Sequence, residues 1–146
     1  MLATRRLLLF SLPVLALALT AFVRIQQDDE TAAIRDALQF YLDGHATGDA
    51  EIMAKAFHPS ARLQYIRDGE VTIRSLESFL GGMSGQPAAD ESQRKRQITM
   101  VDYEGPVAVA RIELDYPQVL FTDYMQLLKT GGEWKIVNKI YHIQRK

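Results

Sequence analysis

The final third of the chain alternates apolar and polar residues almost without interruption, and this alternation limits the fold more than any other feature. From about residue 96 to residue 143 it predicts four strands in succession. The first two are joined at Glu104-Gly105-Pro106 and the last two at Gly131-Gly132, so neighbouring strands run antiparallel. A sheet of this size must bury one face, and the residues before it have to cover that face.

Two helices are predicted before these strands. The first begins after the acidic residues Asp28-Asp29-Glu30, continues with apolar residues at helical spacing, and ends at Gly44 or Gly48. Asp49 can cap a second, shorter helix. His58-Pro59 ends that helix, because the residue before a proline avoids helical geometry. Each helix has an apolar face that can pack on the sheet.

A hairpin and a third helix complete the order of elements. Asp68-Gly69 is a two-residue turn signal between alternating strands, and Ser75 can cap a short helix after them. The residues from about Gly81 onward are small and polar and indicate a loop. Early helices followed by a long meander predict an α+β fold. We expect a cone-shaped, curved antiparallel sheet packed on three N-terminal helices, with an interior where a ligand could bind.

The N-terminus differs in character from the rest of the chain. Arg5 and Arg6 precede an uncharged run from Leu7 to Val23, and small residues lie near its end. This pattern is typical of an export signal, and the run is also just long enough for a membrane anchor. Residues 1–24 are therefore interpreted as a signal peptide or an N-terminal anchor. The domain at residues 28–146 would then be periplasmic or secreted, or held at the inner membrane.

Composition excludes several classes of protein. The chain has 17 basic and 18 acidic residues, which gives no electrostatic argument for nucleic-acid binding. It has no cysteine, and its three histidines lack metal-ligand spacing. Phosphate-binding loops and dinucleotide fingerprints are absent from the sequence. We expect no metal and no cofactor, and membrane contact only through the N-terminal segment.

Two stretches resemble a known family. "FHPSARL" before the hairpin and "FTDYMQLLKTGGEWKIVNKIY" near the end are similar to the nuclear transport factor 2-like superfamily, in its "putative lumazine-binding" (SnoaL-like) branch. The likeness covers about residues 30–144, and the glycine pair followed by "WKIV" is its most specific part. The resemblance implies a cone-shaped barrel that is usually dimeric through the open face of the sheet. The same fold carries ketosteroid isomerase, scytalone dehydratase and polyketide cyclases, so it does not decide the function.

Strand alternation places three polar residues on one face. If Gly131-Gly132 is a two-residue turn, Asp123 faces Ile140, and Asn138 and His142 are its diagonal neighbours on the concave side. A one-residue shift of register would break this grouping. The alternate residues, among them Lys135 and Lys139 with Val137, Tyr141 and Ile143 near them, would face outward and form a homodimer surface.

Asp123 and Tyr124 cannot serve one substrate, because neighbours in a strand point to opposite faces. A tyrosine partner for Asp123 must come from elsewhere, such as Tyr41 or Tyr65. The remaining candidates are aromatic side chains that could contact a ring or simply fill the core: Phe57, Phe79, Phe121 and Trp134.

Three functions remain open at this level. The first is an exported domain that binds a small apolar or aromatic molecule, with Asp123 and Asn138 fixing its orientation. The second is a cofactor-free isomerase, dehydratase or cyclase in which Asp123 is the general base and His142 or a tyrosine polarises the substrate. The third is a structural or partner-binding module of the cell envelope. Binding without catalysis is the interpretation that the residues favour.

Overall fold

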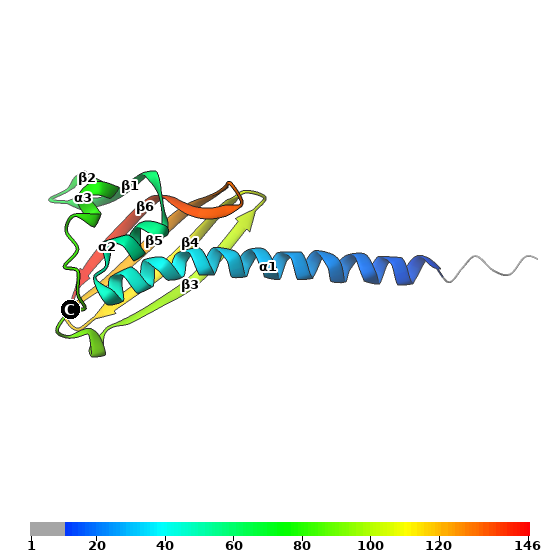
Figure 1. The fold of residues 1–146 in the computed structure, drawn as a ribbon, viewed down its shortest axis with the longest axis horizontal. Helices are drawn as coiled ribbons and strands as arrows, with labels where there is room; N and C mark the ends of the chain where they lie inside the picture. The colour runs from blue at the N-terminus through cyan, green and yellow to red at the C-terminus, as the bar shows by residue number, and fades with distance from the viewer. Residues whose placement is uncertain (1–10) are drawn as a thin grey trace, which may run out of the picture.

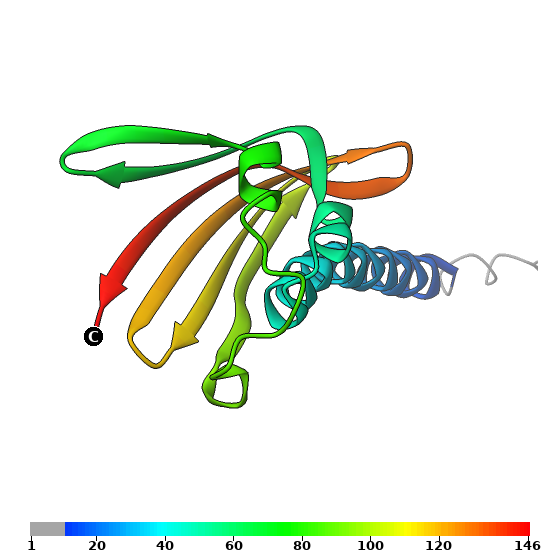
Figure 2. The ribbon, with the colours of Figure 1, turned by 60° about the vertical axis from the view of Figure 1, so that its left-hand side comes forward.

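The computed structural model describes residues 11–146, and the side chains from residue 28 onward. Its elements in chain order are α1 (Ser11–Thr47), α2 (Ala50–Lys55), β1 (Phe57–Arg67), β2 (Glu70–Ser75), α3 (Leu76–Leu80), η1 (Glu91–Gln93), β3 (Lys95–Glu104), β4 (Val107–Tyr116), β5 (Val119–Thr130) and β6 (Glu133–Arg145). Three helices and a curved six-stranded sheet therefore form the expected α+β fold. The C-terminal part of the long α1 lies along the concave side of the sheet, and its N-terminal part extends beyond the sheet (Figures 1 and 2). The helix α3 and the loop after it lie over one end.

Part of the expected export segment, residues 1–10, lies outside the described residues. Within the described part of the chain, none of the helices has the length and apolar character needed to cross a membrane.

The strands form one sheet in the order β2-β1-β6-β5-β4-β3. Every neighbouring pair is antiparallel except β1 and β6, which run parallel. The four-strand meander from β3 to β6 was predicted from alternation, whereas the parallel pairing of the first strand with the last was not. This pairing makes β6 a central strand of the sheet although it is the last element of the chain.

Most local signals for turns and caps are confirmed, but the predicted start of the first helix is wrong, because α1 already begins at Ser11 and runs without a break through Asp28-Asp29-Glu30. Gly131 and Gly132 form the two-residue turn with φ of 59° and 87°, as a hairpin of this length requires. The Asp49 side chain accepts hydrogen bonds from the first amides of α2, and Ser75 caps α3 in the same way. The first helix passes through Gly44 and ends just before Gly48. The second ends earlier than predicted, because β1 already begins at Phe57.

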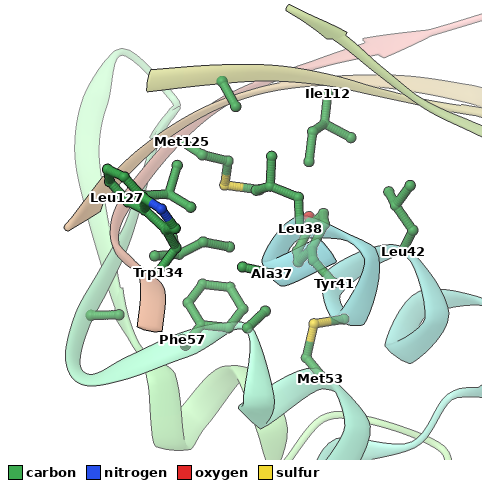
Figure 3. Packing of buried hydrophobic residues seen from close by; sticks show 14 of the residues in the cluster. Ala37, Leu38, Tyr41, Leu42, Met53, Phe57, Ile112, Met125, Leu127 and Trp134 are labelled. Atoms are coloured by element: carbon green, nitrogen blue, oxygen red, sulfur yellow. The ribbon is translucent and has the colours of Figure 1, made fainter. Parts of the chain in front are cut away.

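The core fills the space between α1 and the concave face of the sheet. Figure 3 shows Leu38 and Tyr41 of α1 pointing toward Ile112, Met125 and Leu127 of the sheet. All five side chains are buried. The predicted inward set of β5 is confirmed from its burial pattern, since its alternate residues point to solvent. The polar residues that reach this interior are therefore embedded in a packed apolar core, where an unpaired polar group is costly.

Candidate functional site

A β-bulge in β6 decides which residues reach the interior. From the turn to Leu127↔Ile136 the strands pair as predicted, but the next pair is Gln126↔Asn138, so Val137 is an extra residue. The expectation that Asp123 faces Ile140 is therefore wrong, and Asp123 pairs with Tyr141. Beyond the bulge every side chain of β6 changes face.

The change of face replaces the expected cluster with another. Asn138 lies on the outer side, where it bonds the amides of Gln64 and Gln126. His142 is exposed and pairs with Thr122. Lys139 and Tyr141 turn inward in their place, which also corrects the expectation that both belong to an outer dimer surface. The structure therefore does not bring Asn138 and His142 together with Asp123.

Asp123, Tyr41 and Lys139 form a compact polar cluster inside the core. The Tyr41 hydroxyl donates to Asp123 Oδ2 at 2.5 Å, and Lys139 Nζ donates to the Tyr41 oxygen at 2.8 Å. Lys139 Nζ also lies 3.2 Å from Asp123 Oδ1. The exposed fractions are 0% for Tyr41, 0% for Asp123 and 4% for Lys139. The contact between Tyr41 and Asp123 confirms that the tyrosine partner comes from another element.

In this inner cluster, burial and charge shift the pKa of Lys139 in opposite directions and that of Tyr41 in the same direction. Burial lowers the pKa of Lys139, although the carboxylate of Asp123 partly opposes that shift. Burial and the nearby negative charge of Asp123 raise the pKa of Tyr41 well above its ordinary value. Tyr41 therefore keeps its proton at neutral pH. The negative charge of Asp123 offsets part of the loss of solvent around the Lys139 ammonium.

Two buried polar atoms beside the cluster have no hydrogen-bond partner among the described residues: Asp123 Oδ1 and His45 Nε2. The approach of Lys139 to Asp123 Oδ1 is an ion pair without hydrogen-bond alignment. His45 lies one helical turn after Tyr41, and their rings meet edge to face with centroids 4.6 Å apart. Because buried polar atoms are normally paired, these two atoms are free to bond a polar group of a ligand or a water.

Aromatic rings surround the lysine. Its Nζ lies 4.3 Å from the ring centre of Tyr141, 5.1 Å from that of Tyr41 and 5.7 Å from that of Phe79. Phe79 also meets the buried Phe57 ring, and Tyr65 stacks on Tyr141 at 4.8 Å. Phe79, Tyr141 and Tyr65 are half-buried, so they separate the inner cluster from solvent at the end covered by α3. The ammonium is thus stabilised by ring faces as well as by its carboxylate.

The other predicted aromatic residues lie farther along the interior. Trp134 is buried, and its indole nitrogen donates to Glu30 at 3.0 Å. Phe121 is partly buried against Tyr116. Within residues 11–146, no three His, Asp or Glu side chains gather in a way that could hold a metal ion.

Sequence reasoning missed Lys139, the charged member of the cluster. Alternation counted from Trp134 assigns it to solvent, and no residue near Val137 announces a bulge. Alternation alone does not decide whether Lys139 or its neighbour Ile140 faces the interior, because one of the two must face inward and the other outward. His45 lies at helical spacing on the apolar face of the first helix, a pattern that does not distinguish a packing residue from a ligand-binding one.

His45 is expected to make the protein acid-sensitive. Burial, helped by Lys139, Arg96 and Arg94, lowers its pKa from 6.5 to about 3. The unfolded chain therefore binds a proton that the folded chain does not, so stability is complete above 6.5 and falls as the pH drops toward 3. At pH 5 the loss is about 2 kcal/mol. Urea denaturation at pH 7 and pH 5 measures it.

The matched variants for this prediction are His45→Phe, which keeps an aromatic ring, and His142→Gln, which changes an exposed histidine. We expect His45→Phe to flatten the loss between the two pH values and His142→Gln to leave it unchanged. An equal acid-induced loss in His45→Phe and in the parent would contradict the assignment.

A pocket of about 500 Å³ lies elsewhere, on the outer side of the sheet. Its lining includes Val107 and Val109 of β4, Gln126 and Leu128 of β5, and Val137 at the bulge. Its apolar members continue into an exposed apolar surface, which we call the outer patch: Val107, Val109, Tyr124, Leu128 and Ile140. Contiguous exposed apolar surfaces often mark sites where a protein binds a partner or a ligand.

A curved sheet whose concave side is covered by helices is the architecture of nuclear transport factor 2-like proteins, and this chain has that fold. A solved protein of that class from Shewanella baltica OS155 superposes with a TM-score of 0.73 at 30% identity, over 81% of this chain and 96% of the other. One from Methylobacillus flagellatus KT gives 0.69 at 29% identity, over 80% and 93%.

Within that class, the chain belongs to the family described as "Putative lumazine-binding", whose model matches residues 29–142. It is also similar to a curated protein of Cladobotryum sp. named Aldolase FrzH. The identity is 22% over 102 residues, which are 70% of this chain and 82% of the relative.

Proposed function

We propose that this protein binds a small, planar or aromatic molecule on the concave side of its sheet, at the cluster of Tyr41, Asp123 and Lys139. The observation that carries the proposal is a pair of buried atoms without a hydrogen bond, Asp123 Oδ1 and His45 Nε2, within an otherwise apolar interior. Small-molecule sites typically combine apolar walls with a few converging polar groups. The rings of Phe79 and Tyr141 would stack on the ligand as it enters.

The family description supports this proposal. Lumazine is a flat bicyclic compound with carbonyl and N–H groups, and such a molecule could use both ring stacking and the free atoms of the inner cluster. Lys139 has three N–H groups, of which Tyr41 takes one and Asp123 faces another, so the third can be donated to a ligand carbonyl.

The experiment is NMR mapping of amide shifts in the ¹⁵N-labelled protein during titration with lumazine and, separately, with benzyl alcohol. We expect shifts at His45, Phe79 and Tyr141, and none at Val107 or Val109 of the outer patch. Asp123→Asn should weaken the binding about tenfold or more, because a charged hydrogen-bond partner is lost. His142→Gln is the control and should bind as the parent does. Shifts confined to the outer patch would refute an inner site.

A cofactor-free enzyme is the second candidate, and one specific observation favours it. The 2.5 Å contact between Tyr41 and Asp123, with Lys139 bridging both, is a short proton path inside the core. Acid–base catalysis needs such closely placed groups. The similarity to a protein named as an aldolase points to carbonyl chemistry. Catalysed exchange of the α-protons of cyclohexanone in D₂O, lost in Asp123→Asn, would be the expected sign of it.

We also propose that the protein is exported by residues 1–24. N-terminal sequencing of the protein isolated from the envelope fraction of its own host tests this. A new N-terminus near residue 19 or 22 would support cleavage, an intact one an anchor, and recovery from the cytoplasm alone would contradict export.

The outer patch is proposed to join two copies of the chain. Val109→Lys and Leu128→Lys place charges in its centre, and each should weaken dimerisation roughly 30-fold or more, the effect of losing about 2 kcal/mol at an interface hot spot. Sedimentation velocity at micromolar concentration measures this. Glu77→Lys, on the exposed side of α3, is the control that should not change the dimer. A parent protein that sediments as a monomer would end the proposal.

A further inference from the structure

We propose that Lys139 forms a covalent iminium with an aldehyde or ketone, so that the inner cluster is a carbonyl-condensing site. This inference rests on the proposed function, because the carbonyl compound has to bind at the same inner cluster. The geometry points to it. The Lys139 amine meets a hydroxyl at 2.8 Å that positions it and a carboxylate at 3.2 Å that can take and return the proton of the condensation, all within an apolar interior.

Lys139 is set apart from the other five lysines of the chain by its surroundings. Lys55, Lys95 and Lys146 are exposed, and Lys129 and Lys135 are half-buried beside the carboxylates of Glu30 and Glu133. Lys139 is the buried lysine, with aromatic rings on several sides. Burial lowers the pKa of its amine, which raises the fraction present in the nucleophilic, uncharged form.

The proton route follows from the distances. The ammonium of Lys139 passes a proton to Asp123 Oδ1, which has no other hydrogen-bond donor. The amine nitrogen then forms a bond to the carbonyl carbon, the C=O electron pair moves to oxygen, and a proton shifts from nitrogen to that oxygen to give a carbinolamine. Asp123 returns its proton to the hydroxyl, which leaves as water, and an iminium remains. One carbonyl compound and one ammonium thus give one iminium and one water.

Tyr41 is a positioning residue in this scheme. Its hydroxyl holds Asp123 Oδ2 at 2.5 Å and accepts from Lys139, so the two reacting groups keep a fixed separation. Its raised pKa keeps its proton in place throughout.

The surroundings select the substrate class. The half-buried rings of Phe79 and Tyr141 lie between the amine and solvent, so a carbonyl group attached to a flat, uncharged ring fits better than a charged or heavily hydrated one. We therefore assign small aromatic or cyclic aldehydes and ketones as the substrates.

The test is reductive trapping on the full chain. Benzaldehyde and sodium cyanoborohydride are added at neutral pH, so that any iminium becomes a stable benzyl-lysine, and peptide mass spectrometry locates the label. We expect most of the label at Lys139 and little at Lys135 on the same strand, because the Lys139 amine has a lowered pKa and a carboxylate 3.2 Å away that can take its proton. Trapping confined to the exposed lysines would overturn the proposal.

Variants and a second probe separate the two proposals. Lys135→Arg should leave the label at Lys139 unchanged, and Lys139→Arg, which keeps the positive charge beside Asp123, should abolish it. Circular dichroism checks that Lys139→Arg is folded, and mapping on the parent chain needs no variant at all. If benzyl alcohol shifts the amides of the inner cluster but benzaldehyde is not trapped at Lys139, binding stands and the covalent step is wrong. If neither occurs, the proposed function itself fails.

Discussion

Asp123→Ala is expected to lower the free energy of unfolding by about 3–5 kcal/mol, because it leaves the charge of Lys139 buried without its counter-ion. The same change removes the acceptor of the Tyr41 hydroxyl, which has no exposure to water through which to replace it. Urea denaturation at pH 7 measures the loss. The effect is large because Lys139 and Tyr41 are buried, so that water cannot replace the partner they lose.

A double variant isolates the electrostatic part of this loss. Asp123→Asn with Lys139→Met removes both charges and keeps an oxygen that can accept from Tyr41. Replacing a buried ion pair by neutral groups is often nearly neutral, so most of the stability should return. A double variant as unstable as Asp123→Ala would show that packing, and not the unpaired charge, dominates the cost.

Gly48→Ala is expected to destabilise the protein by about 2–5 kcal/mol, combining a strained backbone with overpacking. Gly48 has a φ of +71°, and an added Cβ would lie 2.2 Å from the carbonyl oxygen of Gln86 and 2.7 Å from Ser84 Oγ. Its own carbonyl accepts from the amide of Gly85 at 2.9 Å. A side chain here would therefore push the loop after α3 away from the end of α1.

Gly69→Ala is the matched control for that strain. Its φ of +84° is equally unfavourable for alanine, but nothing lies within 4 Å of an added Cβ. It should cost about 1–2 kcal/mol, the conformational part alone. The difference between the two variants in urea denaturation measures the clash. Equal losses would mean that the loop moves aside without resistance.

Local signals in the sequence were sufficient for most of the fold. The Gly131-Gly132 turn, the Asp68-Gly69 turn and the cap at Asp49 each depend on a few adjacent residues, and each is present in the structure. The inward position of Asp123 also follows from alternation within one strand. These features could be predicted because their cause lies within a few residues of sequence.

The site could be predicted only in part, because the bulge at Val137 has a non-local cause. β6 must pair with β5 on one side and with β1 on the other, and β1 carries its own irregularity between Phe57 and Arg62. The register of β6 thus involves two strands that are distant in the sequence, and no short stretch reveals where the extra residue falls. Counting by two therefore placed Asn138 in the interior, where the structure has Lys139.

The parallel pairing of β1 with β6 also bears on how the chain folds. Before residue 133 the strands form two unconnected groups, β2 with β1 and the meander from β3 to β5, because β6 is the strand between them. Contacts of this sequence separation slow folding, since a long loop must close before they form. Lys139 arrives on that same last strand, so the counter-ion of Asp123 enters the core only when the sheet closes. We expect a chain emerging from its synthesis or export channel to stay open and sensitive to proteases until β6 is released, and then to close in one cooperative step.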